Sequence, residues 1–452
     1  MMIDFLLNNF ERYKKEDAVV WRDKVYSYEW LLNRVRHYQT EIQTRNIAPG
    51  DVVVLEADFS PNAIAVLLAL IDHRSIVVPL TKTVISKKAE FFSIAKPEYV
   101  LAVDSDDQIS LSRLPYDPEY PFYNVLREKK HPGLVLFSSG STGESKAVVH
   151  DFVSILNKYK KPRKSLRAVT FLLYDHIGGI NTLFYLLANG GCVITVQDRN
   201  PDTVLSTIER YRVELLPTSP TFLNLILLSE AYQNFDLSSL KRITYGTEPM
   251  PESTLKRLHA VFPDVDILQT YGLSEVGILS SKSKSSDSLW MKVGGEGFQT
   301  RIVDGILHIK AESSMLGYLN APSPFTEDGW FNTEDAVEQD GEYIRILGRT
   351  SELINVGGQK VYPAEVESVI QQMENVVEVS VFGENNPITG QIVCARVTPR
   401  VEQEEKEFIK GIKKYCRSHM ESFKVPVKVL LTRDKQYSAR FKKQRLTSTS
   451  HS

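Results

Sequence analysis

The sequence has very few cysteines. Only three occur among 452 residues, and they lie far apart in the chain, at Cys192, Cys394 and Cys416. This spacing excludes a disulfide framework and does not match a zinc-binding pattern. We therefore expect three buried free thiols in a protein of the reducing cytoplasm.

A long hydrophobic run is also missing. The longest apolar stretch, around residues 63–71, is too short to span a bilayer. The first residues, MMIDFLLNNFERYKK, have no basic start followed by an extended apolar segment, so they do not predict a secretory signal. These two observations favour a cytoplasmic protein without a membrane span.

Neither sign of charge dominates. The 56 acidic residues nearly balance the 54 basic ones, for a net charge of −2. Such a balance gives no electrostatic argument for binding nucleic acid. Hydrophobic residues make up 42% of the chain and charged residues 24%, as in ordinary globular proteins. A chain of 452 residues exceeds one typical core, so two or more domains are expected.

The chain alternates between strand-like and helix-like segments. DVVVLEA and SIVVPL flank the helical NAIAVLLALIDH, and two similar groups follow, around residues 168–196 and 242–272. Strand, helix and strand of these lengths predict parallel pairing in a large doubly wound α/β domain. We assign residues 1–349 to this domain. The serine-rich residues 280–288 are expected to form a mobile loop.

After residue 348 the pattern changes. VYPAEVESVIQQM predicts a helix opened by Pro363, and several β-branched segments surround a second helical stretch, EKEFIKGIKKYCRSHM. Residues 350–452 are therefore predicted to form a small C-terminal α+β domain, with the boundary near GRTSE.

One loop is unusually rich in glycine and hydroxyl residues. In FSSGSTGESKAVVH, residues 137–150, Gly140 and Gly143 allow the backbone N–H groups to turn inward. The segment also offers side-chain donors, from Ser138, Ser139, Ser141, Thr142 and Lys146. Such a concave set of donors suits a polyphosphate, although the spacing is not that of a Walker loop or a nucleophile elbow. Taken alone, the segment is equally well interpreted as a surface loop.

Four further segments follow in a fixed order. They are YGTEPM at 245–250, TYGLSEVG at 270–277, GWFNTEDAV at 329–337 and GRTSELINVGGQKVYPAEVE at 348–367. Together with the glycine-rich loop, they closely resemble the motifs of the adenylate-forming superfamily, which contains acyl- and aryl-CoA synthetases, peptide-synthetase adenylation domains and firefly luciferase. The resemblance implies joining of a carboxylate to ATP, release of pyrophosphate, and transfer of the acyl group from AMP to a thiol. In pattern the chain is closest to acid–CoA ligases.

The resemblance implies a nucleotide site. Residues 138–146 would hold the phosphates. Tyr271 would stack on adenine, Ser274 would donate to phosphate, and Glu275 would hold Mg²⁺, for which one carboxylate suffices. The remaining nucleotide-binding residues implied are Gly246, Thr247 and Glu248 beside the base, Gly272, Asp335 at the ribose, and Arg349 at the ribose or phosphate. Taken singly, each has a plain structural alternative: Tyr271 as core, the carboxylates as helix caps, and the arginine as a surface charge.

A catalytic lysine is expected near the C-terminus. Family members end on a conserved lysine that contacts the α-phosphate and the carboxylate. Aligning YSARFKKQR to that ending places Lys442 on the lysine, with Phe441 in place of a glycine. A shifted register would give the role to Arg440 or Lys443, and a solvated basic tail is a further alternative.

The resemblance also implies rotation of the small domain between two half-reactions. The hinge position is Ser351, where the family usually has Asp or Lys. In the rotated state Gly357 and Gly358 would line a tunnel for the thiol acceptor, because glycines permit close approach.

The segment LLYDHIGGINTLF bears on the acid. Amino-acid-activating relatives have an aspartate after an aromatic residue, whereas acid–CoA ligases often have a histidine followed by glycines. His176 occupies that position, Gly179 belongs to the glycine pair, and Asp175 comes one residue early. We expect a carboxylic acid without an α-amino group.

Several functions are compatible with these motifs. The leading hypothesis is an acid–CoA ligase using ATP, Mg²⁺ and CoA. Alternatives are a ligase that loads the phosphopantetheine arm of an acyl carrier protein, and an amino-acid adenylating enzyme. A catalytically weak acyl-adenylate-binding protein is suggested by the departures from the family pattern at Ser145, Glu334, Ser351 and Phe441.

Overall fold

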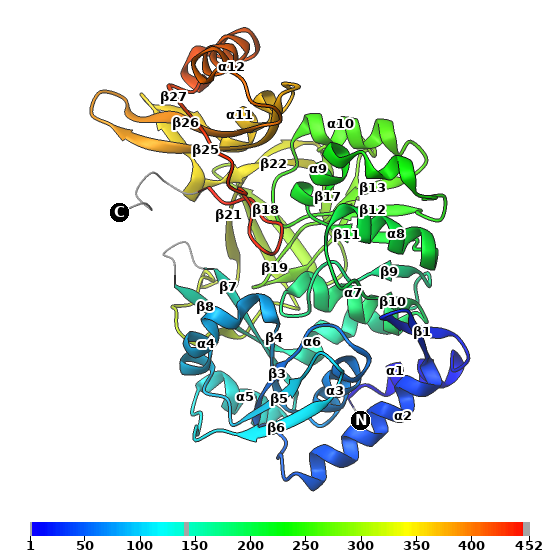
Figure 1. Ribbon diagram of the computed structural model, residues 1–452. Coiled ribbons are helices and arrows are strands. Elements are labelled where there is room, and N and C mark those ends of the chain that lie inside the picture. Colours follow the sequence, from blue (N-terminus) through cyan, green and yellow to red (C-terminus); the bar gives the residue numbers. More distant parts are fainter. Residues whose placement is uncertain (1, 140–143, 446–452) are drawn as a thin grey trace.

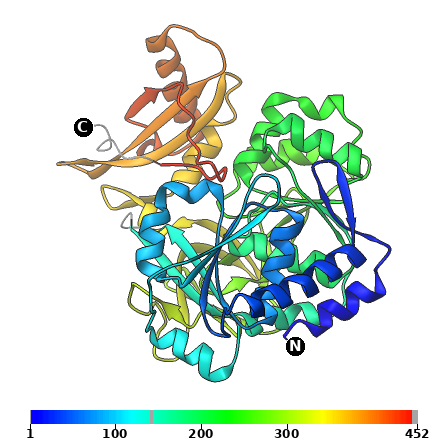
Figure 2. The ribbon, with the colours of Figure 1, turned by 60° about the horizontal axis from the view of Figure 1, so that its bottom comes forward.

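A computed structural model describes residues 2–139 and 144–445 (Figure 1). A large domain carries three sheets, and a small C-terminal domain caps one end of it (Figures 1 and 2). This confirms the expected α/β class with a large N-terminal and a small C-terminal domain. None of the helices within the described residues has both the length and the apolar character that crossing a bilayer requires.

Two seven-stranded sheets form the α/β part. The first is parallel except at one edge and contains, in order, β13 (Asp266–Gln269), β12 (Arg242–Tyr245), β11 (Leu215–Thr218), β9 (Arg167–Val169), β10 (Cys192–Ile194), β1 (Asp17–Trp21) and β2 (Lys24–Ser27). The second has a parallel centre and contains β20 (Gly317–Tyr318), β8 (Ser145–Asp151), β7 (Gly133–Ser139), β4 (Ile76–Leu80), β3 (Val52–Glu56), β5 (Tyr99–Val103) and β6 (Ile109–Arg113). The alternation in the sequence predicted a large doubly wound α/β domain, and the structure divides it into two sheets.

A third, antiparallel sheet completes the large domain. It contains β16 (Ser280–Ser283), β17 (Met291–Gly294), β22 (Tyr343–Arg349), β21 (Phe331–Asp340), β19 (Ile306–Ala311) and β18 (Phe298–Val303). A short hairpin, β14 (Gly272–Leu273) and β15 (Gly277–Ile278), lies between the first sheet and this one in the chain. The expected mobile loop at residues 280–288 is wrong: its first four residues form β16, and the hydroxyls of Ser283 and Ser286 accept the Gln269 and Ile267 amides.

Helices cover the sheets of the large domain. They are α1 (Asp4–Arg12), α2 (Tyr28–Thr44), α3 (Pro61–Asp72), α4 (Lys88–Ala95), α5 (Pro121–Lys129), α6 (Phe152–Leu156), α7 (Ile177–Ala188), α8 (Pro201–Tyr211), α9 (Pro220–Ser229) and α10 (Glu252–Val261), with 3₁₀ turns η1 (Lys82–Lys87), η2 (Asn157–Lys160) and η3 (Ala231–Asn234). Ser27 caps α2 by accepting the Trp30 N–H, as expected from the sequence. The apolar α3 is buried along its length, from Pro61 to Ile71.

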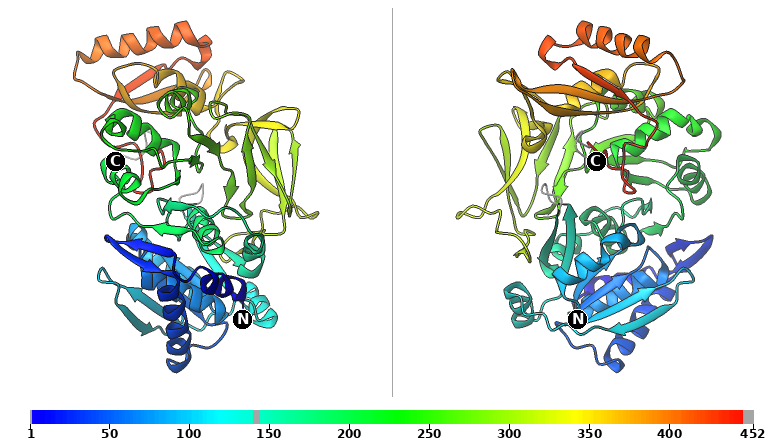
Figure 3. Two further views of the ribbon diagram at one scale, coloured as in Figure 1. Left: turned by 90° about the vertical axis from the view of Figure 1, so that its right-hand side faces the viewer. Right: turned by 60° about the vertical axis from the view of Figure 1, so that its left-hand side comes forward.

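The small domain has its own core. Its sheet contains β24 (Gln359–Val361), β23 (Ile354–Val356), β26 (Gly390–Pro399), β25 (Val376–Asn386) and β27 (Lys428–Leu431), with α11 (Pro363–Ile370), α12 (Glu405–His419), η4 (Thr350–Glu352) and η5 (Ser422–Lys424). After β27 the chain runs back into the large domain (Figures 1 and 3). All three cysteines are buried and free, as expected.

Candidate active site

The C-terminal tail forms a tight hairpin. The Ser438 N–H donates to the Lys442 carbonyl at 2.8 Å, and Tyr437 pairs with Lys443. At the tip, Phe441 has a φ of +54°, in the left-handed region that favours glycine. Glycine, which the family pattern has at this position, would adopt the same conformation without steric cost. The Phe441 ring packs against Phe222 of α9, with centroids 5.2 Å apart.

The large domain holds this hairpin at several points. Four polar contacts join them: Ser219 Oγ to the Phe441 carbonyl (2.8 Å), the Lys443 N–H to Glu248 Oε2 (2.8 Å), Arg199 Nη2 to the Ala439 carbonyl (3.3 Å), and Arg440 Nη2 to Asp175 Oδ2 (2.6 Å). The small domain is therefore docked onto the large domain through its tail.

Lys442 lies among the residues expected at the reaction centre. Burial lowers the pKa of Lys442, while the carboxylates of Glu248 and Glu275 oppose this shift. The charge of Lys442 in turn reaches His176. Within the described residues the Lys442 ammonium forms no ion pair.

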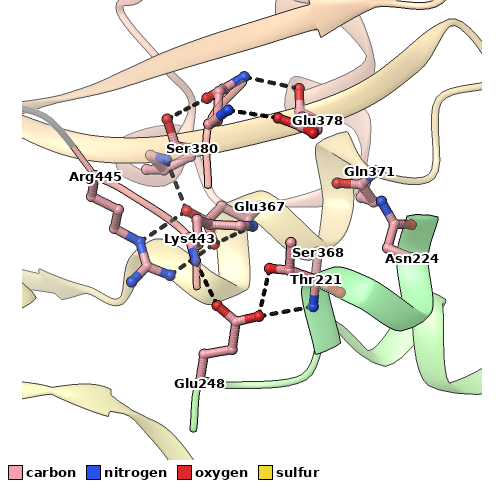
Figure 4. Close-up of polar contacts among 12 residues, drawn as sticks. Thr221, Asn224, Glu248, Glu367, Ser368, Gln371, Glu378, Ser380, Lys443 and Arg445 are labelled. Carbon is pink, nitrogen blue, oxygen red and sulfur yellow. Dashed lines mark hydrogen bonds and ion pairs between the residues drawn. The ribbon is translucent and has the colours of Figure 1, made fainter. Parts of the chain in front are cut away.

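The other two candidates for the catalytic residue, Arg440 and Lys443, each form an ion pair with a carboxylate. The Lys443 ammonium pairs with Glu367 of α11 at 3.1 Å (Figure 4). Arg440 pairs with Asp175. Glu367 also forms an ion pair with Arg445, in which Nη2 and Oε2 are 2.9 Å apart. Burial by itself raises the pKa of Glu367, but the charges of Arg445 and Lys443 hold it at about 2.

Glu248 connects the large domain to the tail. Its Oε1 accepts the N–H and hydroxyl of Thr221, at 2.8 and 2.5 Å, and its Oε2 accepts the Lys443 N–H (Figure 4). The turn before it is tightly packed. A Cβ on Gly246 would lie 2.7 Å from Thr270 Oγ1, and Thr247 has a φ of +74°.

The expected ribose residues lie together. Asp335 on β21 faces Arg349 on β22, and Nε and Oδ1 are 3.4 Å apart. The Tyr271 hydroxyl donates to the other carboxylate oxygen at 2.5 Å. Burial raises the pKa of Asp335, and the charge of Arg349 and the bond from Tyr271 oppose it. Tyr271 is 8% exposed, and its ring packs with an apolar cluster beneath Asp335.

Two residues that the motifs did not indicate contact Glu275 and Ser274, the residues predicted to bind Mg²⁺ and phosphate. The Tyr318 hydroxyl donates to Glu275 Oε1 at 2.8 Å, and the Lys146 ammonium lies 5.3 Å from the Tyr318 ring centre. His150 Nε2 donates to the carbonyl of Ser274 at 2.6 Å. Burial lowers the pKa of His150 to about 4. No local sequence signal distinguishes either residue from core.

The donor set fits a phosphate-bound cation. Within the described part of the chain, no three His, Cys, Asp or Glu side chains cluster in a way that could hold a metal ion by themselves. Glu275 is thus a single carboxylate, as expected for Mg²⁺ that keeps several waters and phosphate oxygens.

The glycine-rich loop is described only at its two ends. Gly140, Ser141, Thr142 and Gly143 lie outside the described residues. Strands β7 and β8 pair Ser138 with Lys146 and Ser139 with Ser145, so the loop begins and ends at adjacent points. The buried Ser145 donates its N–H to Glu90 Oε1 at 3.0 Å, and its hydroxyl accepts from Lys87 Nζ at 3.2 Å. The family's proline could not make the first of these bonds.

His176 is the first residue before helix α7. Its Nδ1 accepts the Gly178 N–H at 3.1 Å, so in the neutral ring the hydrogen lies on Nε2. Burial, together with the charges of Lys442 and Arg440, holds the pKa of His176 well below its usual range. A Cβ on Gly179 would lie 1.9 Å from the Leu173 carbonyl oxygen, so backbone packing alone requires glycine there.

The remaining predicted residues lie in the connection and in the small domain. Ser351 is exposed in η4. Gly357 and Gly358 have φ values of +59° and +87° and form the exposed turn between β23 and β24, which explains the glycine pair locally. Among the described residues, Lys442 therefore lies near His176, Glu248, Glu275 and Arg349, whereas no contact given for this turn joins it to them.

Comparison with known proteins gives a consistent result. The AMP-binding enzyme family model matches residues 6–318, and the AMP-binding enzyme C-terminal domain matches residues 365–442. The indoleacetate–CoA ligase of Aromatoleum aromaticum is 25% identical over 436 residues, covering 84% of this chain and 85% of that ligase. A long-chain-fatty-acid–CoA ligase of Mycobacterium tuberculosis is 28% identical over 321 residues, covering 66% of this chain and 63% of that ligase.

Solved structures show the same fold. The anthranilate CoA ligase AuaEII, in complex with anthranoyl-AMP, superposes with a TM-score of 0.84 at 19% identity, covering 98% of this chain and 95% of that one. The amide bond synthetase McbA from Marinactinospora thermotolerans superposes with a TM-score of 0.76 at 20% identity, covering 97% and 98%.

Proposed function

Because the chain belongs to the AMP-binding enzyme family and is an AMP-forming acid–CoA ligase in type, we propose that it activates a carboxylic acid as acyl-AMP and passes the acyl group to the thiol of CoA. Pyrophosphate leaves in the first step. The acid carries no α-amino group. The CoA acceptor is supported by the names of the relatives, which are CoA ligases.

The observation that carries this proposal is the position of Lys442. A residue of the C-terminal tail lies close enough to Glu248, Glu275 and Arg349 for their charges to shift its pKa. These residues come from widely separated motifs. Among the described residues this ammonium has no carboxylate in an ion pair with it, and the charge of Glu275 acts on it. Such an ammonium suits a reaction in which negative charge develops on a leaving group.

We assign the first half-reaction to the following groups. ATP supplies the adenylyl group. Glu275 would hold Mg²⁺, which would neutralise charge on the phosphates. Asp335 accepts the ribose hydroxyls, with Arg349 and Tyr271 fixing its orientation. The Lys442 ammonium stabilises the charge that develops as pyrophosphate leaves. His176 presents a neutral imidazole to the acid, because Nδ1 is engaged as the helix cap.

The second half-reaction requires the tail to leave. We propose that residues 350–452 rotate about Ser351, which breaks the contacts of Arg440 and Lys443 with the large domain. The exposed turn at Gly357 and Gly358 then reaches the acyl-adenylate and admits the thiol. A hinge needs no particular side chain, so serine at this position is adequate.

Pyrophosphate release with a panel of carboxylic acids tests the proposal. We expect release that depends on the acid and on Mg²⁺, followed by acyl-CoA formation when CoA is added. If the acyl group were transferred only to a holo carrier protein, the acceptor would be a phosphopantetheine arm and not CoA. Tight binding of an acyl-adenylate without pyrophosphate release would indicate a binding protein instead.

A further inference from the structure

Lys158 is a lysine in the interior of the large domain that the proposed mechanism does not use. It lies in η2, and its ammonium donates to Asn181 Oδ1 at 2.6 Å and to the Ile278 carbonyl at 3.2 Å. Both acceptors are neutral. The Tyr159 hydroxyl donates to the same Asn181 oxygen at 3.0 Å.

The environment of Lys158 contains no compensating anion. Among the described residues no carboxylate forms an ion pair with its ammonium, and the nearest charge that acts on it is that of Arg163. Burial, with the charge of Arg163, lowers the pKa of Lys158 to about 7. Withdrawing an ammonium from water without an anion is costly. An anionic ligand would recover this cost.

Lys158 joins two elements that begin near residues expected at the active site. Helix α7 begins beside His176, and Asn181 comes about 7.5 Å further along the axis, at 1.5 Å per residue. Ile278 follows Glu275 by three residues, and α7 packs against both β15 and η2. Asn181 keeps accessible surface although Ile180 and Thr182 on either side of it are buried. The Lys158 ammonium therefore bridges the helix that follows His176 and the strand that follows Glu275.

We propose that Lys158 binds a second anionic group at the distal end of the substrate, so that the preferred acids are dicarboxylic. This inference rests on the proposed function, because it takes His176 and Lys442 as the end where the reacting carboxylate is activated. The distal carboxylate pairs with the Lys158 ammonium and completes an ion pair that the protein alone leaves open.

Binding without turnover provides the direct test. Calorimetry in the presence of α,β-methylene-ATP compares adipate with hexanoate, and 3-(4-carboxyphenyl)propionate with 3-phenylpropionate. We expect the diacid of each pair to bind at least ~10-fold more tightly to the unmodified protein, since a hydrogen bond to a charged group is worth more than a kcal/mol. Equal or weaker diacid binding would overturn the proposal.

Substitutions separate a ligand-binding role from a structural one. Lys158→Met keeps the apolar stem and removes the charge, so it should abolish the diacid preference, whereas Lys158→Arg should retain part of it. Tyr159→Phe is the matched control, because it removes a hydrogen bond to Asn181 without removing charge. A diacid preference that survives in Lys158→Met, or disappears equally in Tyr159→Phe, would contradict a binding role for the ammonium.

Pyrophosphate release with ATP distinguishes failure of this inference from failure of the proposed function. Turnover of monoacids without diacid preference leaves the ligase intact and overturns the role of Lys158. Diacid-selective binding that depends on Lys158, but without pyrophosphate release from any acid, supports the site and contradicts the ligase.

Discussion

Arg440 and Asp175, which lie 265 residues apart in the sequence, form a 2.6 Å ion pair where the C-terminal tail enters the large domain. The Asp175 side chain is only 3% exposed, and Thr81 donates to the same carboxylate oxygen at 2.7 Å. Burial raises the pKa of Asp175, and the charge of Arg440 is the main opposing effect. The docked tail thus supplies the cation that this buried carboxylate needs.

Arg440→Met should slow adenylation while sparing acyl transfer. Removing one partner of a buried pair leaves the other unpaired, which commonly costs about 3–5 kcal/mol. Part of this cost is avoided because the Arg440 side chain is 27% exposed, so we expect at least a ~10-fold loss in pyrophosphate release. Thioester formation from preformed acyl-AMP should change little.

Two controls accompany this variant. Arg433→Met removes an exposed arginine that pairs only with exposed Glu402, and it should leave both half-reactions unchanged. Adding Asp175→Asn to Arg440→Met should restore part of the rate, because the unpaired charge is gone. An equal loss in both half-reactions would contradict a role in docking.

Lys442→Ala should reduce adenylation far more than it weakens ATP binding. A charge that acts on the developing leaving group is commonly worth ~100- to 1000-fold in rate. Lys443→Ala should cost less, because Glu367 keeps Arg445 as a partner. Rapid-quench measurement of acyl-AMP and calorimetric binding of ATP separate the two effects. If Lys443→Ala or Arg440→Ala abolishes adenylation and Lys442→Ala does not, the assignment of the catalytic lysine is wrong.

The sequence predicted features that depend on local backbone chemistry, such as the helix cap at Ser27, which followed from the residue types around it. The nucleotide residues were implied by the resemblance of motifs in a fixed order, and their roles stay predictions. Partners distant in the chain left no local signal. Tyr318 beside Glu275, and Arg440 beside Asp175, become neighbours only because β20 and the tail pack where they do. The division into two sheets likewise depends on packing, which alternation alone does not specify.

His150 should make stability depend on pH. Its pKa of about 4 in the folded protein lies below the ordinary 6.5, so the unfolded chain binds the proton first. The contribution of neutral His150 to the free energy of unfolding is therefore complete above pH 6.5. It is lost as the pH falls toward 4, which lowers the free energy of unfolding by up to about 3 kcal/mol. His150→Gln retains a donor for the Ser274 carbonyl but does not titrate, so its urea midpoint should fall less between pH 7.5 and 5. The exposed His37→Gln is the control, and a pH response of His150→Gln equal to that of the unmodified protein would contradict the prediction.

Glu334 combines an unfavourable backbone conformation with an unfavourable charge. Its φ is +59°, and its charge acts on Tyr318, the partner of Glu275. Glu334→Gly should therefore raise the free energy of unfolding by up to about 1 kcal/mol, because glycine adopts this conformation without steric cost. Glu334→Gln keeps the backbone cost and removes only the charge. Both variants should lower the KM for ATP at low salt. The difference in KM from the unmodified protein should fade as salt is added. A lower KM in Glu334→Gly but not in Glu334→Gln would show that the backbone conformation, and not the charge, causes the effect.

His176 predicts discrimination against amino acids. A neutral imidazole offers no counter-charge to an α-ammonium, and an unpaired buried charge costs more than a kcal/mol. The neighbouring carboxylate, Asp175, already accepts from Thr81 and Arg440 while the tail is docked, the state to which we assign adenylation. Pyrophosphate release should therefore be at least ~10-fold faster with 3-phenylpropionate than with phenylalanine, and with propionate than with alanine. Asp175→Asn should leave these ratios unchanged. A consistent preference for the amino acid that is lost in Asp175→Asn would show that the carboxylate turns into the acid pocket, and would replace the acid–CoA ligase by an amino-acid adenylating enzyme.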